Sequence, residues 1–321
     1  MNINRDLVTS EFRDNGIAIL TLNRPLAMNA LNKELISRLE EKFFKAESDP
    51  KVTAIVLRGA GNQFVAGADI KFFIKKIQTR NYLDILSFTR KTSELFLAIE
   101  NSNKITLAIL DGLSLGGGSE LALSCQAIVA TDSGSMAFPE TAIGIYPGLG
   151  GMFRLSRKIG PALTKYYVFT GAGILASEAF DLGLVQAVVS PNELDQTIDK
   201  IVGFGIQKAT KPLVKSERLK ELEALFSSVY LMDQIGRNEY DTLSGQLSKK
   251  ILETKKILEI LQKKAPLALK AANEIIDQQV GKSAREAIEI ELARLVDMFS
   301  TRDALEGLSC AGKKKPTYIG K

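Results

Sequence analysis

The sequence predicts an α/β fold whose C-terminal part is helical. Three observations lead to this class: β-branched runs alternate with helical patterns in the first half, strand-like runs fade after about residue 160, and an amphipathic pattern covers residues 283–299. The 321 residues, 45% apolar and 25% charged, can bury a large core in one domain with an appendage, or in two domains.

The predicted elements follow from local periodicity. Strands are expected at Ile17–Leu22, 53–57, Ile105–Leu110 and 127–130, which are rich in β-branched or aliphatic residues and bounded by turn formers. Residues 33–46 and 82–99 carry helical periodicity. A further helix is predicted over 283–299, because apolar residues recur at i, i+4, i+7 and i+11: Ile288, Leu292, Leu295 and Phe299. Residues 190–250 contain basic stretches and predict either a helical insertion or an ordered appendage.

Composition excludes several classes of protein. No run approaches the ~20 apolar residues that span a bilayer, and the N-terminus has no apolar stretch like that of a signal peptide, so we expect no membrane partner and a cytoplasmic location. The excess of 42 Lys and Arg over 37 Asp and Glu suits an anionic ligand but is too diffuse to predict nucleic-acid binding. Cys125 and Cys310 lie far apart and indicate no disulfide framework.

The chain contains no histidine, which excludes a Ser-His-Asp or Cys-His mechanism and removes the commonest zinc ligand. Residues 112–116 fit the G-x-S-x-G pattern of a nucleophile elbow, but Ser114 lacks a histidine base and is interpreted as structural. Neither G-x-G-x-x-G nor a Walker-type motif is present. Acid–base chemistry would therefore fall to carboxylates, Lys, Tyr or Cys.

Residues 115–151 hold two carboxylates in distinctive settings. A predicted strand leads into Gly116, Gly117 and Gly118 and then into a helix-forming run that begins at Glu120. Glycines allow a sharp turn and close approach of a ligand, and N–H groups at a helix start can donate to developing negative charge. Glu140 follows a proline and is expected in a loop at a strand end. Pattern alone also allows a solvated helix glutamate and a surface loop residue.

The runs LGGGSELALSCQAIVA and FPETAIGIYPGLGG resemble the signature of the crotonase (enoyl-CoA hydratase/isomerase) superfamily. FVAGADIK at 64–71 is similar to its second signature, and further matches are NRP at 23–25, MNAL at 28–31, TG at 170–171, 179–185, 301–307 and KP at 315–316. The resemblance covers most of the chain. It implies a crotonase-like spiral of repeated ββα units over 1–190, which holds the active site, and a helical region over 191–321 with an extra segment at about 191–250.

The resemblance also implies roles for individual residues. The thioester carbonyl would be held by the backbone N–H groups of Ala68 and Gly117, which stabilise an enolate-like transition state. Segments similar to the family's coenzyme A-binding stretches supply Pro25, Leu26, Ala27, Met28, Ala66, Asp69 and Ile70. The lysines at 313–315 fit either coenzyme A phosphates or a solvated tail.

Family members that hydrate enoyl-CoA carry glutamates at the positions of both Glu120 and Glu140, so the resemblance favours an enoyl-CoA hydratase. Glu120 would act as base on a shared water, a protonated Glu140 would supply the proton, and Gly148 matches the glycine whose N–H supports that water. Two close carboxylates titrate as a pair, so their starting protonation stays open. No cofactor or metal is expected, because coenzyme A is part of the substrate.

Several alternatives remain open at this point. A Δ3,Δ2-enoyl-CoA isomerase or another enolate-forming acyl-CoA enzyme is the nearest, and an RNA-binding or scaffolding member of the superfamily is the alternative from another class. Phe72, Phe73 and Tyr146 either line an acyl pocket or pack in the core. The resemblance further implies a homotrimer, or a hexamer formed by two trimers, with contacts from the helical C-terminal part.

Overall fold

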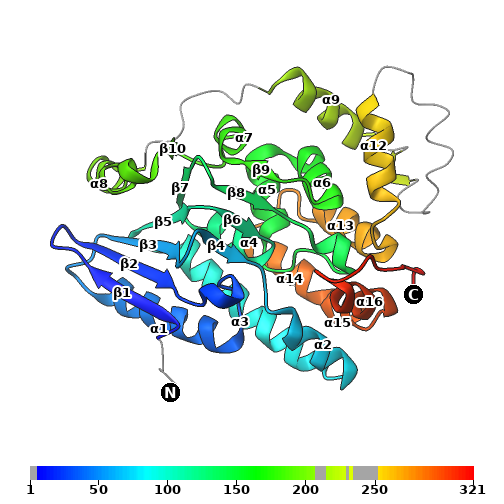
Figure 1. Cartoon of the computed structure of the whole chain (residues 1–321), viewed down its shortest axis with the longest axis horizontal. Coiled ribbons are helices and arrows are strands. Elements are labelled where there is room, and N and C mark those ends of the chain that lie inside the picture. The colour runs from blue at the N-terminus through cyan, green and yellow to red at the C-terminus, as the bar shows by residue number, and fades with distance from the viewer. Residues whose placement is uncertain (1–5, 207–214, 229–230, 234–251) are drawn as a thin grey trace. The chain divides into compact units, whose positions relative to one another are not determined.

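The computed structural model describes residues 6–206, 215–228, 231–233 and 252–321 (Figure 1). The chain forms two compact units, each assembled from segments that are far apart in sequence. Unit 1 takes in Met1–Asp69, Arg90–Met136 and Gly173–Val214, and unit 2 takes in Ile70–Thr89, Ala137–Ala172 and Lys215–Lys321. The division of the fold at residue 190 stays a prediction.

Unit 1 is built on a six-stranded sheet in the order β1-β2-β3-β5-β7-β10. Its outer strand β1 runs antiparallel to β2, and each later pair is parallel (Figure 1). Parallel neighbours require crossover connections, which places long segments of chain between successive strands. The bounds of the six strands are β1 (Val8–Phe12), β2 (Ile17–Leu22), β3 (Ala54–Gly59), β5 (Ile105–Leu110), β7 (Ala127–Thr131) and β10 (Ala187–Val189).

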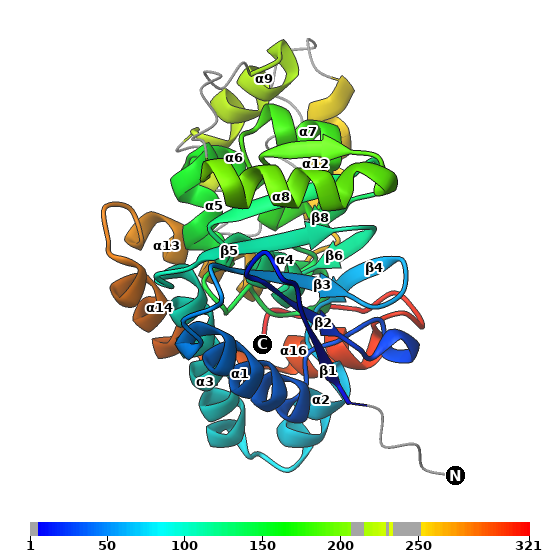
Figure 2. The same ribbon diagram turned by 90° about the vertical axis from the view of Figure 1, so that its left-hand side faces the viewer.

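Alternate strand residues form one apolar face of this sheet, as the period of two requires. Ile198 of α8 (Leu194–Phe204) packs into that face, and Figure 2 shows α8 turned toward the viewer. Helix α1 (Lys33–Ser48) contacts β1, β2 and β3, and the Asn32 side chain caps its N-terminus by accepting the N–H of Leu35 at 2.8 Å. The buried face consists of Ile17, Ile19, Ala54, Val56, Leu107, Ile109, Ala127 and Val129.

A second, four-stranded sheet follows the order β4-β6-β8-β9. Its strands are β4 (Gln63–Ala66), β6 (Leu113–Leu115), β8 (Ser135–Ala137) and β9 (Ile174–Leu175). The pair β4 and β6 is parallel, while β8 and β9 are antiparallel, so this sheet is mixed like the first. Helix α4 (Gly117–Ser124) contacts β4 and β6, and α7 (Ala176–Asp181) follows β9 directly.

Unit 2 is helical, and α6 (Pro161–Thr170) lies at its centre. Every residue of α6 after Pro161 is buried, and the helix packs against α5, α9, α12 and α13 (Figure 1). Tyr166 and Phe169 of α6 both meet the ring of Phe226, at centroid distances of 5.5 and 6.2 Å. The other helices are α2 (Ile70–Gln78), α5 (Gly151–Ile159), α9 (Glu217–Phe226), α12 (Leu252–Leu261), α13 (Pro266–Gln278), α14 (Ala284–Ala293), α15 (Leu295–Phe299) and α16 (Arg302–Cys310); α3 (Tyr82–Glu100) has its first residues here and the rest in unit 1.

The predicted α/β class with a helical C-terminal part is confirmed, and β2 and β5 have the predicted bounds. Two local predictions are wrong. Strands do not end near residue 160, since β10 completes the six-stranded sheet. The single helix over 283–299 is two helices, because Arg294 adopts φ −101° and ψ 0° and its N–H donates to the carbonyl of Glu291, three residues back.

The described residues of the segment at 191–250 include one helix in unit 1 and one helix in unit 2. Its helix α8 packs on the six-stranded sheet, and α9 packs on α6. Residues 207–214, 229–230 and 234–250 of that segment lie outside the described residues. Among the residues described, no helix combines the length and apolar character needed to cross a bilayer.

Candidate active site

Glu120 occupies the first turn of α4 in unit 1, as the glycine run predicts. Gly116 precedes the helix with φ 46° and ψ −120°, a conformation open to glycine, and its carbonyl accepts the Glu120 N–H at 2.9 Å. The whole helix is buried, and only 2% of Glu120 is exposed. A carboxylate in this place faces the positive end of the helix dipole.

Gly118 fits α4 closely against β4. A Cβ added at Gly118 would lie 2.1 Å from the carbonyl oxygen of Val65, so only glycine allows this approach. Strand β4 also pairs with β6 through Ala66 and Leu115. The two segments that lead to Ala68 and to Gly117 are therefore neighbours in the same unit.

The N–H groups of Ala68 and Gly117 are available to a ligand. Leu31 forms backbone hydrogen bonds with the two neighbours of Ala68: its N–H donates to Gly67 O at 2.9 Å, and its carbonyl accepts the Asp69 N–H at 2.8 Å. In the described part of the chain, the N–H of Ala68 has no acceptor. Gly117 is the first residue of α4 and has no acceptor within the helix. Unit 1 thus supplies two donors of the kind that form an oxyanion hole.

The predicted coenzyme A-binding residues of unit 1 lie together. Pro25, Leu26 and Ala27 form the 3-10 helix η1 (Pro25–Ala27), and Met28 follows in the left-handed region with φ 49°. The Met28 carbonyl accepts the Ala66 N–H at 2.9 Å, which joins this turn to β4. Leu26 is 99% exposed, so its side chain is open to a ligand.

Two residues that hold this turn had no assigned role in the sequence. Asn29 is buried and donates to the carbonyls of Ala60 and Phe64 at 2.9 and 3.0 Å, while its own side-chain oxygen accepts the Arg24 N–H. Arg24 forms an ion pair with Asp69 at 3.0 Å. Arg24 lies in the NRP motif and Asn29 in the MNAL motif, and these motifs were the sequence signal that could have identified the two residues.

Glu140 belongs to unit 2, in a setting that differs from the predicted loop. It begins the 3-10 helix η2 (Glu140–Ile143) and is 7% exposed. Thr141 fixes this turn, because its hydroxyl donates to Val168 O at 3.1 Å and its carbonyl accepts the Ala265 N–H at 3.0 Å. A local pattern could not reveal this turn, since its partners lie far along the chain.

The turn that carries Gly148 is held by a buried carboxylate, Glu291 of α14. Glu291 is 0% exposed and accepts the Gly150 N–H at 2.8 Å and the Gln279 side-chain N–H at 2.8 Å. Tyr146 donates its hydroxyl to the Glu291 carbonyl at 2.6 Å, and burial, with the charge of Glu291, raises the pKa of Tyr146. Tyr146 is therefore a neutral donor that braces the turn. The sequence signal for Glu291 was a charged residue between Ile288 and Leu292 of the apolar stripe.

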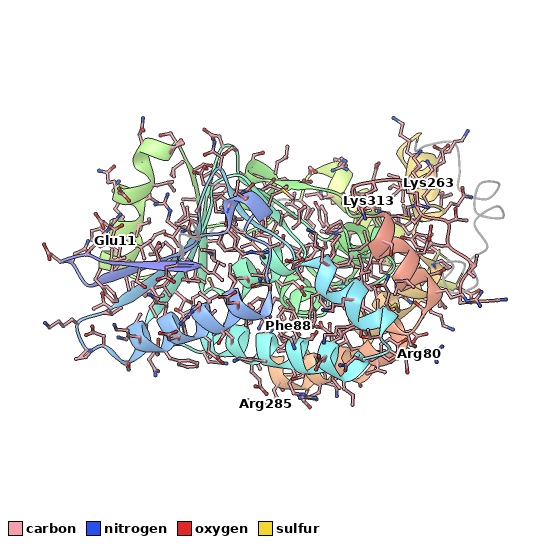
Figure 3. The ribbon with its side chains drawn as sticks, turned by 60° about the horizontal axis from the view of Figure 1, so that its bottom comes forward. Glu11, Arg80, Phe88, Lys263, Arg285 and Lys313 are labelled. Atoms are coloured by element: carbon pink, nitrogen blue, oxygen red, sulfur yellow. The ribbon has the colours of Figure 1, made fainter. Side chains whose placement is uncertain are left out.

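The aromatic candidates for an acyl pocket pack in unit 2. Phe73 is 6% exposed and stacks on Phe299 with ring centroids 5.0 Å apart. The ring centroid of Phe72 lies 5.2 Å from that of Phe88, which is labelled in Figure 3. These contacts are those of a core cluster. Ser114, in β6, is buried, and its carbonyl accepts the hydroxyl of Ser119 at 3.0 Å.

The predicted site residues divide between the two units. Unit 1 contains Ala68, Gly117 and Glu120 with the predicted coenzyme A-binding residues up to Asp69, and unit 2 contains Ile70, Glu140 and Gly148. Within the described residues, no three His, Cys, Asp or Glu side chains gather as metal ligands would. The lysines at 313–315 are exposed.

Residues 17–317 match the family model described as enoyl-CoA hydratase/isomerase. The chain is 38% identical over 197 residues to crotonyl-CoA hydratase of Syntrophomonas wolfei subsp. wolfei, covering 61% of this chain and 74% of that protein. It is 28% identical over 309 residues to a probable mitochondrial enoyl-CoA hydratase 2 of Arabidopsis thaliana, covering 96% and 83%. The crystal structure of an enoyl-CoA hydratase from Rhodobacter sphaeroides 2.4.1 superposes with a TM-score of 0.82 at 21% identity, covering 98% and 93% of the two chains.

Proposed function

The chain belongs to the enoyl-CoA hydratase/isomerase family, and from this premise we propose that it is an enoyl-CoA hydratase, a hydro-lyase. Its fold is the α/β crotonase fold with two mixed sheets and C-terminal helices. The proposed reaction adds water reversibly to a trans-2-enoyl-CoA and gives a 3-hydroxyacyl-CoA. The observation that carries the proposal is the buried Glu120, one turn from Gly117 and its N–H.

The proposed role of unit 1 is to polarise the thioester. When the carbonyl oxygen accepts the N–H groups of Ala68 and Gly117, negative charge that develops during water addition is stabilised. Polarisation draws electrons from the double bond and makes the β-carbon electrophilic. The oxyanion donors alone would serve any enolate-forming reaction of an acyl-CoA, so the carboxylates must decide which reaction follows.

Two carboxylates are assigned to the addition of water. Glu120 acts as general base and directs the water oxygen to the β-carbon, while Glu140, in its protonated form, supplies a proton to the α-carbon. Gly148 supports the same water through its N–H. Glu120 belongs to unit 1 and Glu140 to unit 2. The proposed reaction requires that both glutamates act on one water, and this requirement can be tested.

Binding of coenzyme A is assigned to the residues around the η1 turn and to the 66–70 segment. Their exposed and backbone groups in unit 1 support this assignment, in particular Leu26 and the turn joined to Ala66. Coenzyme A enters as part of the substrate, and hydration transfers no electrons to a carrier. The reaction therefore needs no separate redox cofactor. A cytoplasmic location and a place in fatty-acid or related acyl-CoA metabolism remain predictions.

The names of similar proteins support hydration over its nearest alternative, isomerisation of an enoyl-CoA. The test is to mix the protein with crotonyl-CoA, follow the ultraviolet absorbance of the conjugated thioester, and analyse the products by mass. Hydration predicts loss of that absorbance together with a mass gain of one water molecule. An unchanged mass would exclude a hydratase that acts on this substrate.

Assembly is a separate part of the proposal. We expect a homotrimer, or a hexamer of two trimers, with contacts supplied by the C-terminal helices. Light scattering of the purified chain at micromolar concentration measures the mass directly. A monomer in solution would contradict the assembly without affecting the assignment of the reaction.

A further inference from the structure

Unit 2 contains a cavity of about 640 Å³ next to the turn that follows α12. Residues 262–264 form this turn and one wall of the cavity. The C-terminal segment 315–319 forms the other wall. Ala142 of η2 also lines the cavity, and the hydroxyl of Tyr318 donates to its carbonyl at 2.7 Å. The cavity therefore adjoins the short helix that begins with Glu140, within the same unit.

The charged groups of this cavity are all cationic. Lys263, Lys264 and Lys315 line it, and no acidic side chain does so in the described part of the chain. The other titratable lining residue is Tyr318, whose pKa is raised, mainly by burial. The carboxylates that hold the C-terminal wall belong to α16 and accept backbone N–H groups: Asp303 accepts those of Ile319 and Gly320, and Glu306 accepts that of Thr317.

Lys264 differs from Lys165, another lysine of this unit that is removed from solvent. The buried Lys165 pairs with Asp277 at 2.7 Å, whereas no carboxylate among the described residues forms an ion pair with Lys264. Its Nζ lies 3.4 Å from the point where a Cβ on Gly171 would be, and that point is 3.3 Å from Pro139 Cα. The amine thus lies beside Gly171, and the position it faces there is also close to Pro139, the residue before Glu140. Burial without a counter-charge lowers the pKa of Lys264 to about 8.

We propose that Lys264 is a nucleophilic amine, and that the cavity around it is a site of acylation by acyl thioesters. The neutral nitrogen attacks the thioester carbonyl, the carbon–sulfur bond breaks, and the sulfur leaves with the electron pair. The proton released from nitrogen goes to the thiolate, so the products are an amide on Lys264 and a free thiol. That acyl-CoA is the natural thioester rests on the proposed function.

The surroundings of Lys264 favour acylation of its amine. A desolvated lysine is activated because a larger fraction of its amine is neutral near physiological pH. The cavity is wide enough for a short acyl chain, and the amide removes the charge that burial disfavours. Lys263 is the matched control, since it lines the same cavity from the adjacent position but is exposed.

The first experiment measures amine reactivity without any coenzyme A. The folded full-length chain is labelled with trace acetic anhydride between pH about 6.5 and about 10.5, and each lysine is quantified by peptide mass spectrometry. The labelling of Lys264 should rise with a midpoint near pH 8, well below the ordinary range of a lysine side chain, and at pH 8 it should exceed the labelling of Lys263. In urea-unfolded protein the two lysines should become alike. If Lys264 follows Lys263 in the folded chain, the proposal is wrong.

The second experiment tests the thioester. With acetyl-CoA at about pH 8, Lys264 should be acetylated at least about tenfold faster than Lys263, and K264R should lose this modification while K263R keeps it. Equal rates at the two lysines would overturn the proposal. Acetyl-CoA has no double bond to hydrate, so selective acetylation in a protein that fails to hydrate crotonyl-CoA would support this site and reject only the proposed function.

Discussion

Glu291 holds Gly150 by a 2.8 Å hydrogen bond from the glycine N–H to the Glu291 carboxylate, across 141 positions of the chain. Gln279 donates to the other carboxylate oxygen of Glu291. The turn that includes Gly148 is thus fixed by a side chain of the C-terminal helical region. The position of the Gly148 N–H, which the proposed reaction needs, depends on α14.

Replacing Glu291 should therefore cost stability. E291A leaves the N–H of Gly150 and the amide of Gln279 without their buried acceptor, and we expect a loss of roughly 3 kcal/mol or more. E291Q keeps one acceptor oxygen and should lose less. Urea unfolding followed by circular dichroism measures both. E289A, an exposed change on the same helix, should stay within about 0.5 kcal/mol; a loss as large as that of E291A would contradict this account.

Glycine positions offer a second test of the local structure. Gly203 lies in α8 with no positive φ, and a Cβ there would meet nothing within 4 Å, so G203A should stabilise the chain by about 0.5–1 kcal/mol. Gly150 has φ +85°, and its Cβ would lie 2.4 Å from an Arg154 nitrogen. G150A should therefore be destabilising.

Gly281 provides the matched control for this comparison. It has φ +75° and open space around the added carbon, so G281A should cost only the backbone strain of roughly 1 kcal/mol. Thermal unfolding of the three variants ranks them. A G150A variant as stable as G281A would show that the contact with Arg154 relaxes without cost.

The sequence predicted those elements whose cause is local. The β-branched run of β2 and the glycine turn before Glu120 are both readable within a few residues, and both have the expected structure. Glu140 was expected in a loop. The short helix η2 was not visible in the sequence, because the hydrogen bonds of Thr141 that fix it go to residues 168, 169 and 265. Glu291 was hidden for the same reason: its acceptor role exists only once Gly150 has been brought to it.

Short strands were missed for a related physical reason. β6 and β8 have three residues each, too few for a period of two to be distinguished from chance. Their pairing stabilises them, and pairing partners are not visible in a single sequence. The break at Arg294 likewise interrupts a stripe of apolar residues that reads as one continuous helix.

The proposed oxyanion hole predicts the effect of a bulky residue at Gly117. A valine at this first position of α4 should block the approach of the thioester and lower turnover of crotonyl-CoA by at least about a hundredfold, the scale of losing one donor. Folding should be largely kept, and circular dichroism checks it. G118A is the contrasting variant, because its added carbon would meet Val65 O at 2.1 Å and should destabilise the fold. A folded G117V enzyme with parental turnover would mean that the site lies elsewhere.

The lowered pKa of Lys264 predicts a pH dependence of stability. The unfolded chain holds this proton up to the ordinary pKa of 10.5 and the folded chain only to about 8, so folding is disfavoured below pH 8 and this cost is relieved as pH rises through that window. K264M removes the charge. Its stability gain over the parent should be largest near pH 7, up to about 3 kcal/mol, and should shrink toward pH 10. Urea unfolding at several pH values measures the difference, and a gain independent of pH would contradict it.

The glutamates give the most direct test of the proposed reaction. Glutamine keeps the size of glutamate but cannot transfer a proton, and general acid–base catalysis is typically worth about 10²–10⁴-fold. E120Q and E140Q should each lose hydration of crotonyl-CoA by roughly that factor while still binding acyl-CoA, which titration calorimetry can verify. E193Q, an exposed change in η3 (Pro191–Glu193), serves as the control and should keep parental turnover.

The double variant tests whether the two carboxylates act on one water. Groups that act as a unit are strongly non-additive, so E120Q/E140Q should be far less than multiplicatively worse than either single variant. An isomerase would depend steeply on one glutamate and little on the other, and an RNA-binding protein would be indifferent to both. Steady-state kinetics of the four proteins distinguish these patterns. Hydration at a near-parental rate in either single variant would reject the two-glutamate mechanism while leaving the family and the fold unchanged.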